Sequence, residues 1–360
     1  MVQLTRDVRL MYPDISHSEF GAAQRVLRSG WLSEGDDVYA FEDAIASYVG
    51  VKHAIAVPNA TLGLCVALSE VCVDRTGRCV VPAFTHPATA LAVTPSDRSV
   101  LFSDVSIHDG NMIGQGVAEC CDLYLPDAVV PVSWGGVALD EGVYLNARAY
   151  ETPVVEDCAC GLGAINSTGH LAGSQADVSV LSFHARKIIT SAGEGGMVLT
   201  NDPDIDCRLR DVKNFGRHGT NLKMGNINAA VGLEQLRRLD DIISYRSKMA
   251  AYYDTLLRAH GLSPWLPPLR GSERRTYQSY CVRVPYRDRL IRDLKVAGIE
   301  TQIGTYYLPG IPSFSCPGCF PNARSLGSEL LTLPLHHLMS VEDQEFVVES
   351  IVALLKSYEV

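Results

Sequence analysis

Seven short apolar runs, rich in β-branched residues, recur through the first 200 residues of this 360-residue chain. They cover residues 54–57, 79–81, 100–102, 128–130, 153–155, 178–181 and 197–199. None has the apolar–polar alternation of a half-exposed strand, and this is typical of strands buried on both faces. Helix-like stretches separate several runs, as in residues 38–48, where Phe41, Ala44, Ile45 and Tyr48 share one face. The pattern predicts an α/β fold with a largely parallel sheet between two layers of helices.

The pattern changes after about residue 240. Residues 242–257 have the periodicity of one long amphipathic helix, and a strand over 280–284 and helices over 287–297 and 341–358 follow. A chain of 360 residues also exceeds the usual size of a single core. We therefore expect a large domain over residues 1–240 and a smaller α+β C-terminal domain over residues 241–360.

Charge and cysteine usage exclude several classes of protein. The net charge is −10, from 41 acidic and 31 basic side chains, which argues against a nucleic-acid-binding surface. The sequence has no apolar run long enough to span a membrane, and residues 1–7 lack the apolar core of a secretory signal. Eleven cysteines without an export signal indicate reduced thiols and a cytoplasmic protein. Cys316 and Cys319 form the only CxxC pair, which is half of a zinc site, so no metal is expected.

A lysine and an aspartate each follow one of the predicted strands. Lys187 comes shortly after the run 178–181, and Asp157 ends the segment 153–157, thirty residues earlier. Ligands of such sheets bind at the carboxyl ends of the strands, where both residues fall. Pyridoxal phosphate chemistry needs an amine that forms a Schiff base with the aldehyde and a carboxylate that keeps the pyridine nitrogen protonated. We predict pyridoxal 5′-phosphate as the cofactor, with Lys187 and Asp157 as catalytic residues.

The chain resembles the DegT/DnrJ/EryC1/StrS family, the sugar aminotransferase group of fold-type I pyridoxal-phosphate enzymes. The resemblance runs from about residue 30 to the C-terminus, and it depends on an ordered set of motifs rather than on any one. The motifs are Gly30-Trp31-Leu32-Ser33, Phe41-Glu42, Tyr48-Val49-Gly50-Val51, Val81-Pro82-Ala83-Phe84-Thr85, Glu156-Asp157, Ser182-Phe183-His184 with Lys187, Gly193-Glu194-Gly195-Gly196, Met224-Gly225-Asn226-Ile227-Asn228-Ala229-Ala230 and Leu333-Pro334-Leu335-His336. The family implies a mostly parallel seven-stranded sheet with helices on both faces.

The resemblance also assigns cofactor-binding residues. In the family, the junction that corresponds to Asn59-Ala60-Thr61-Leu62 cradles the cofactor phosphate with backbone amides and a hydroxyl, which implies Ala60 and Thr61 as ligands. Ser182 matches a further phosphate ligand. Asn221 matches a phosphate ligand that the neighbouring subunit supplies. A homodimer with shared active sites is therefore expected.

Two residues depart from the family pattern. His86 stands where Phe, Tyr or Trp commonly stacks on the cofactor ring; an imidazole can stack or form hydrogen bonds, and Phe84 is an alternative for the stacking role. Cys160 stands where His or Gln commonly contacts the phenolic oxygen of the cofactor, and a thiol is a poor hydrogen-bond partner. The segment 104–145 is also shorter than usual. These differences affect the expected substrate more than the expected reaction.

The resemblance implies a transaminase that takes an amino group from Glu or Gln and delivers it to a keto group of a nucleotide-linked deoxysugar. Some relatives carry histidine in place of the lysine and dehydrate the sugar, and Lys187 argues against that class. Two alternatives stay open: a cyclitol aminotransferase or aminohydroxybenzoate-type synthase of the same family, and a non-catalytic regulatory relative. Cofactor absorbance distinguishes the regulatory protein, and a substrate panel distinguishes the other enzymes.

Overall fold

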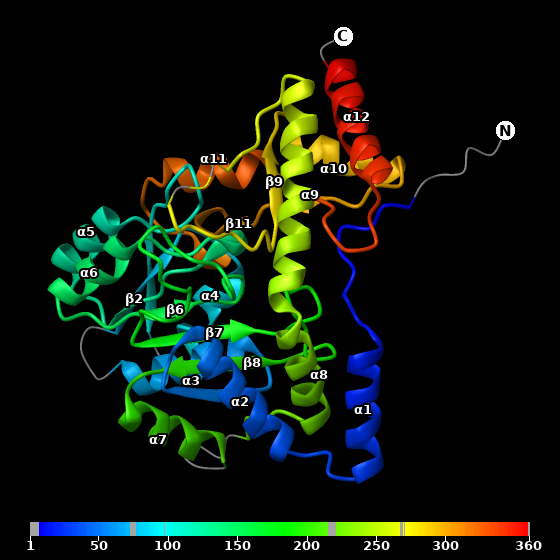
Figure 1. The fold of residues 1–360 in the computed structure, drawn as a ribbon. Helices are drawn as coiled ribbons and strands as arrows, with labels where there is room; N and C mark the ends of the chain where they lie inside the picture. The colour runs from blue at the N-terminus through cyan, green and yellow to red at the C-terminus, as the bar shows by residue number, and fades with distance from the viewer. Residues whose placement is uncertain are drawn as a thin grey trace.

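The computed structural model describes residues 7–72, 77–96, 98–214, 221–266, 269 and 271–358 (Figure 1). All seven predicted strands are confirmed. They are β1 (His53–Val57), β2 (Arg78–Pro82), β4 (Ser99–Ser103), β5 (Ala128–Val129), β6 (Val155–Asp157), β7 (Val178–Ser182) and β8 (Gly196–Thr200).

These strands form one mixed sheet in the order β1-β8-β7-β6-β5-β2-β4. A four-stranded and a three-stranded part are joined by parallel bridges from Val129 to Val154 and from Val132 to Asp157. The pairs β7–β6, β5–β2 and β2–β4 are parallel, whereas β8 is antiparallel to both β7 and β1. The expected mostly parallel sheet is confirmed. The direction of β8 was not predicted, because a strand buried on both faces has the same composition in either direction.

Helices bury both faces of the sheet, as the apolar runs predicted. On β1, Ala54 and Ala56 belong to a core that contains Phe41 of α2 (Asp36–Val49), while Ile55 and Val57 belong to a second core that contains Leu64 of α3 (Ala60–Val71). Successive strand residues point to opposite faces, so this division places α2 and α3 on opposite sides. The remaining helices around the sheet are α4 (Pro87–Leu91), α5 (Gly114–Tyr124), α6 (Glu141–Ala149), α7 (Pro203–Lys213) and α8 (Asn226–Arg237).

The C-terminal part has its own sheet and its own core. Strands β10 (Gln302–Ile303), β12 (Leu330–Leu333) and β9 (Tyr280–Arg283) pair antiparallel in that order. They pack with α9 (Leu239–Ala259), α10 (Arg287–Val296), α11 (Pro321–Glu329) and α12 (Val341–Tyr358). Val8 joins this core and bridges to Ile299, so the N-terminal segment packs with the C-terminal part before entering α1 (His17–Ser29). The domain boundary at residue 240 stays a prediction.

A two-stranded pairing links the C-terminal part to the residues beside the main sheet. Strand β11 (Tyr306–Tyr307) pairs antiparallel with β3 (Phe84–Thr85), and Tyr306 lies opposite Thr85. Single turns of 3₁₀ helix lie at η1 (Thr94–Ser96), η2 (Trp134–Gly136), η4 (Leu308–Gly310) and η5 (Pro312–Phe314). The β3–β11 pairing fixes one wall of the cavity described below.

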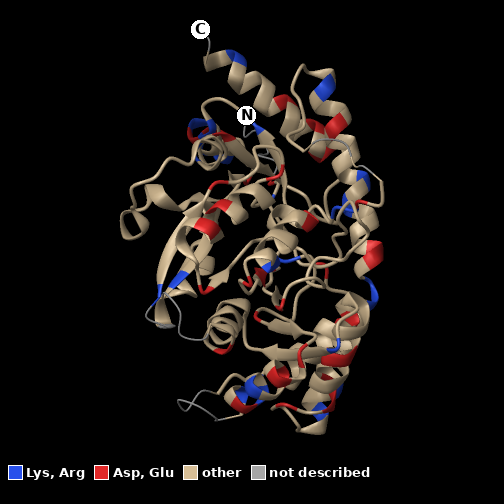
Figure 2. Ribbon diagram, turned by 90° about the vertical axis from the view of Figure 1, so that its left-hand side faces the viewer, with Lys and Arg blue, Asp and Glu red and all other residues tan. Residues whose placement is uncertain are grey.

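Acidic and basic residues are interspersed along the helices (Figure 2). All eleven cysteines are free thiols. In the part of the chain that the structure describes, none of the helices combines the length and apolar character needed to cross a membrane.

Candidate active site

A cavity of about 900 Å³ opens at the carboxyl ends of β6 and β7 and at the start of α3. Its lining includes Ala60, Thr61, His86, Asp157, Cys160, Ser182 and Lys187. These seven residues come from well-separated segments of the sequence, and all were predicted as site residues. The eighth, Asn221, is exposed, bridges to Asn214, and lies outside the cavity lining of its own chain.

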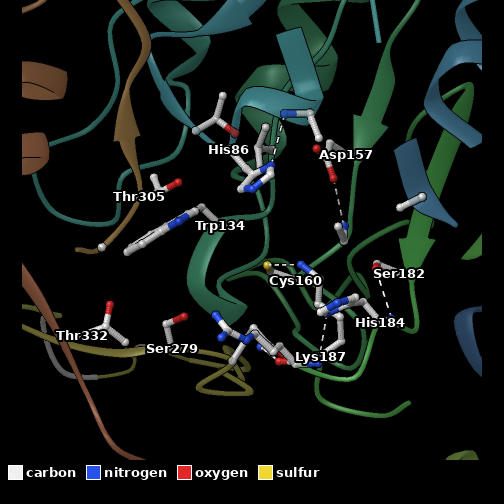
Figure 3. Close-up of a pocket in the computed structure, with 18 of the residues that line it drawn as sticks. His86, Trp134, Asp157, Cys160, Ser182, His184, Lys187, Ser279, Thr305 and Thr332 are labelled. Carbon is white, nitrogen blue, oxygen red and sulfur yellow. Dashed lines mark hydrogen bonds between the residues drawn. The ribbon is translucent and has the colours of Figure 1, made fainter. Parts of the chain in front are cut away.

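Lys187 is half-buried in a loop whose preceding residues are hydrogen-bonded to the glycine-rich turn at 193–196. Phe183 and Ala185 donate backbone hydrogen bonds to the carbonyls of Gly195 and Gly193, at 2.8 and 2.9 Å. Lys187 Nζ donates to Cys160 Sγ at 3.1 Å (Figure 3). Burial favours a lower pKa for Lys187, but the Cys160 sulfur and the nearby Asp157 carboxylate favour the ammonium form, and the net effect raises the pKa.

Asp157 lies at the end of β6, with 6% of its surface exposed. Its backbone N–H donates to Pro131 at 2.9 Å, and its carbonyl accepts from Ser133 N–H at 3.1 Å, so the strand end is held in register. The carboxylate accepts from the hydroxyl of Thr89 at 2.7 Å and from the backbone N–H of Ala159 at 3.1 Å. Each carboxylate oxygen therefore has a hydrogen-bond donor that holds it at the cavity wall.

The start of α3 supplies backbone donors to the cavity. The N-cap Asn59 accepts from Leu62 N–H at 2.9 Å, while the N–H groups of Ala60 and Thr61 have no acceptor within the helix. Gly196 of β8 lies so close that a Cβ on it would be 2.7 Å from the carbonyl carbon of Asn59 and 2.8 Å from Ala60 N. Only glycine allows this approach, so β8 fixes the position of the helix terminus.

His86 lies at the cavity as the N-cap of α4. Its Nδ1 accepts from Ala88 N–H at 3.1 Å, so the neutral ring carries its hydrogen on Nε2. Burial, and then the positive charge of Lys187, lower the pKa of His86. The ring meets Tyr306 edge-on, with centroids 5.9 Å apart. Phe84, the alternative stacking residue, is fully buried against Trp134 and does not line the cavity.

Several residues that the sequence did not point to complete the cavity. Trp134 lines it and packs edge-on against Trp265, with centroids 5.3 Å apart. Trp134 and the hydroxyls of Ser279, Thr305 and Thr332 lie to the left in Figure 3, whereas Asp157 and Ser182 lie to the right. One end of the cavity is therefore lined by the Trp134 indole and by hydroxyl groups, and the other end is lined by Lys187 and Asp157.

Arg246 of α9 also lines the cavity and is buried without a carboxylate partner among the described residues. Its guanidinium donates to the carbonyls of Tyr277, Gln278 and Leu335 at 2.6–3.1 Å. Burial lowers the pKa of Arg246 to about 10. Its contacts join the helix to two C-terminal segments, so it stabilises the cavity wall.

The residues at the cavity fit pyridoxal phosphate. An amine and a carboxylate line one cavity, and the same cavity is lined by the N-terminus of α3 and by the hydroxyls of Thr61 and Ser182. Amides and hydroxyls bind phosphate, and Lys187 and Asp157 are the groups that an aldehyde and a pyridine nitrogen require. In the described residues, no group of three or more His, Cys, Asp or Glu side chains is arranged to hold a metal.

Comparison with known proteins agrees with this chemistry. The sequence profile of the DegT/DnrJ/EryC1/StrS aminotransferase family matches residues 13–352. The chain is 30% identical to GDP-perosamine synthase of Caulobacter vibrioides, over 94% of this chain and 96% of that protein. It is 29% identical to dTDP-3-amino-3,4,6-trideoxy-alpha-D-glucose transaminase of Micromonospora megalomicea, over 92% of each. The solved aminotransferase TlmJ from Streptoalloteichus hindustanus superposes with a TM-score of 0.91 at 28% identity, over 98% of this chain and 100% of that chain. The chain belongs to the DegT/DnrJ/EryC1/StrS aminotransferase family, whose members are generally pyridoxal-phosphate-dependent.

Proposed function

We propose that this protein uses pyridoxal 5′-phosphate to transfer an amino group from Glu or Gln to a keto group of a nucleotide-linked deoxysugar. The observation that carries the proposal is the single cavity that Lys187, Asp157 and the N-terminus of α3 line together. Full-length similarity to aminotransferases that act on nucleotide sugars supports the substrate class.

Each of these groups has a defined task. When bound, pyridoxal phosphate supplies an aldehyde for amine capture and a ring that withdraws electrons from the reacting carbon. The amides of Ala60 and Thr61, with the Ser182 hydroxyl, bind the phosphate. Asp157 would keep a proton on the pyridine nitrogen. Lys187 Nζ would hold the cofactor through its aldehyde and, once freed, would move a proton between the donor's α-carbon and the cofactor carbon.

The far end of the cavity suits a sugar ring. The Trp134 indole offers a flat apolar surface, and Ser279 and Thr305 offer hydroxyls that can pair with hydroxyls of a ligand. A cyclitol offers similar groups, so the substrate panel must contain both. Nucleotide-linked 3-keto and 4-keto deoxysugars and a cyclitol ketone, each with Glu or Gln as donor, would distinguish these activities.

A homodimer is part of the proposal. Asn221 is exposed and outside the cavity of its own chain, as a residue that serves a neighbouring subunit would be. The N-terminal helices and the turn between them also expose large apolar side chains, as oligomer interfaces do. They are Phe20, Leu27, Trp31, Leu32 and Tyr39.

Borohydride reduction tests the central assignment. The purified protein should be yellow, and reduction should remove the visible band and fix the cofactor to Lys187 in a peptide map. Lys187→Ala serves as the control and should yield no fixed cofactor. Attachment to another lysine, or a protein that binds no cofactor, would contradict the proposed function and favour a regulatory relative.

A further inference from the structure

Two buried threonine hydroxyls connect strand β3 to the Asp157 carboxylate. Thr85 is 1% exposed and Thr89 of α4 is fully buried. Their hydroxyl oxygens are 3.1 Å apart, and the Thr89 hydroxyl lies 2.7 Å from Asp157 Oδ2. The three side chains form a hydrogen-bonded line that ends at the cavity.

The direction of this line follows from counting hydrogens. A threonine hydroxyl has one hydrogen to donate, and an ionised carboxylate can only accept. Thr89 therefore donates to Asp157 and must accept from Thr85. The Asp157 Oδ1 atom is held separately by Ala159 N–H at 3.1 Å, so both carboxylate oxygens have a fixed donor.

The far end of the line is held by the C-terminal part of the chain. Thr85 lies opposite Tyr306 in the β3–β11 pairing, and Tyr306 also contacts the His86 ring. The position of Thr85 is thus fixed by backbone pairing rather than by a mobile loop. The hydroxyl of Thr89 cannot turn away without leaving a buried donor or acceptor unpaired.

We propose that Thr89 is a positioning residue for Asp157, oriented by Thr85, and that it fixes the plane of the carboxylate that faces the cofactor's pyridine nitrogen. The inference rests on the proposed function. Loss of the Thr89 donor should leave Oδ2 without its partner and let the carboxylate rotate about its Cβ–Cγ bond. Removal of one hydrogen bond to a charged group should lower kcat by roughly tenfold to a hundredfold, with little change in KM.

The test uses Thr89→Val, which keeps the shape and removes the hydroxyl, and Thr89→Ser, which keeps the hydroxyl. The readout is the ¹⁵N NMR signal of holoenzyme loaded with pyridine-¹⁵N-labelled cofactor, because that signal reports protonation of the ring nitrogen. Asp157→Asn supplies the unprotonated reference. Thr200→Val is a matched control, since it removes another buried hydroxyl that donates to Asp177 O at 2.9 Å, at the opposite end of the sheet.

We expect the ring-nitrogen signal of Thr89→Val to move toward that of Asp157→Asn, while Thr89→Ser and Thr200→Val keep the wild-type signal. An unchanged signal in Thr89→Val, or equal damage in Thr89→Ser, overturns the inference. If Thr89→Val does not fold, Thr85→Val decides: a smaller shift in the same direction supports the line, and no shift overturns it. Failure of the wild-type protein to bind cofactor would instead contradict the proposed function.

Discussion

Substitution of Gly196 by alanine should damage the proposed phosphate site at the N-terminus of α3 through the backbone. The added Cβ would lie 2.7 Å from the carbonyl carbon of Asn59 and 2.8 Å from Ala60 N, whereas ordinary contact begins near 3.4 Å. Strand β8 and the start of α3 would have to separate by about 0.6–0.7 Å, and overpacking of this kind costs about 1–3 kcal/mol of stability. The same shift would lengthen hydrogen bonds from the helix amides beyond about 3.5 Å, which breaks them.

Two other glycines separate the effect on the cradle from general destabilisation. In Gly63→Ala, which is also in α3, the Cβ would meet methyl groups of Val180, Val57 and Val198 at 2.9–3.3 Å, so the clash is with core side chains and not with the backbone of the helix N-terminus. Gly21 of α1 has nothing within 4 Å, so alanine there should be neutral or stabilise the helix by up to about 1 kcal/mol.

The assays are denaturant unfolding of the cofactor-free protein and titration with pyridoxal phosphate by absorbance. Gly196→Ala should lower the affinity for the cofactor at least about tenfold, which corresponds to about 1.4 kcal/mol of binding free energy. This loss should come in addition to its effect on the free energy of unfolding. Gly63→Ala should lose stability and keep its affinity for the cofactor. Wild-type affinity in Gly196→Ala would refute the reasoning, because the helix N-terminus would then not hold the phosphate.

Substitutions at three further residues test individual contacts. Cys160→Ala removes the sulfur that favours the ammonium form of Lys187, so the pKa of Lys187 should fall. Stopped-flow absorbance should then detect rapid cofactor binding by the cofactor-free protein at a lower pH than in wild type. An unchanged pH profile would show that Cys160 does not have this role. His86→Phe keeps a ring and loses the bond from Ala88 N–H, whereas His86→Asn can keep the cap and loses the ring. If the ring covers the cofactor, titration with pyridoxal phosphate should give His86→Phe near-wild-type affinity, and His86→Asn should bind as weakly as His86→Ala. The reverse order would show that His86 acts only as a helix cap. Asn221→Ala should weaken cofactor retention in the proposed dimer, measured by dialysis and light scattering, and a monomer that retains its cofactor fully would contradict a shared site.

The strands and the two reactive groups could be predicted from the sequence because each leaves a local pattern. A strand buried on both faces needs a continuous run of apolar residues, and Ala54–Val57 shows both faces in use. Lys187 and Asp157 each come after such a run, so the sheet topology brings them to one edge. His86 and Cys160 were expected at the site by position, and both line the cavity.

The remaining features depend on contacts between distant segments, which leave no such pattern. Thr89 lies in a short Ala- and Thr-containing segment that resembles an ordinary helix start, yet its partner Asp157 is 68 residues away. Arg246 has the pattern of a solvent-facing charge on an amphipathic helix, but it is buried and bonds carbonyls 31 to 89 residues away. Trp134 lies in the segment that is shorter than usual in the family, where motif comparison gives the least guidance.

These three residues share a physical role that explains why sequence patterns missed them. Each joins segments that are far apart in the sequence: Thr89 through Thr85 to β11, Trp134 through Trp265 to the segment after α9, and Arg246 of α9 to the carbonyls that precede β9. The motif residues determine which reaction the cavity can perform, because their chemistry is fixed by side-chain type. The shape of the cavity and the orientation of Asp157 instead depend on how the C-terminal part packs against β3 and η2. Substrate preference within this family should therefore vary with residues at that junction, while Lys187 and Asp157 keep the same tasks.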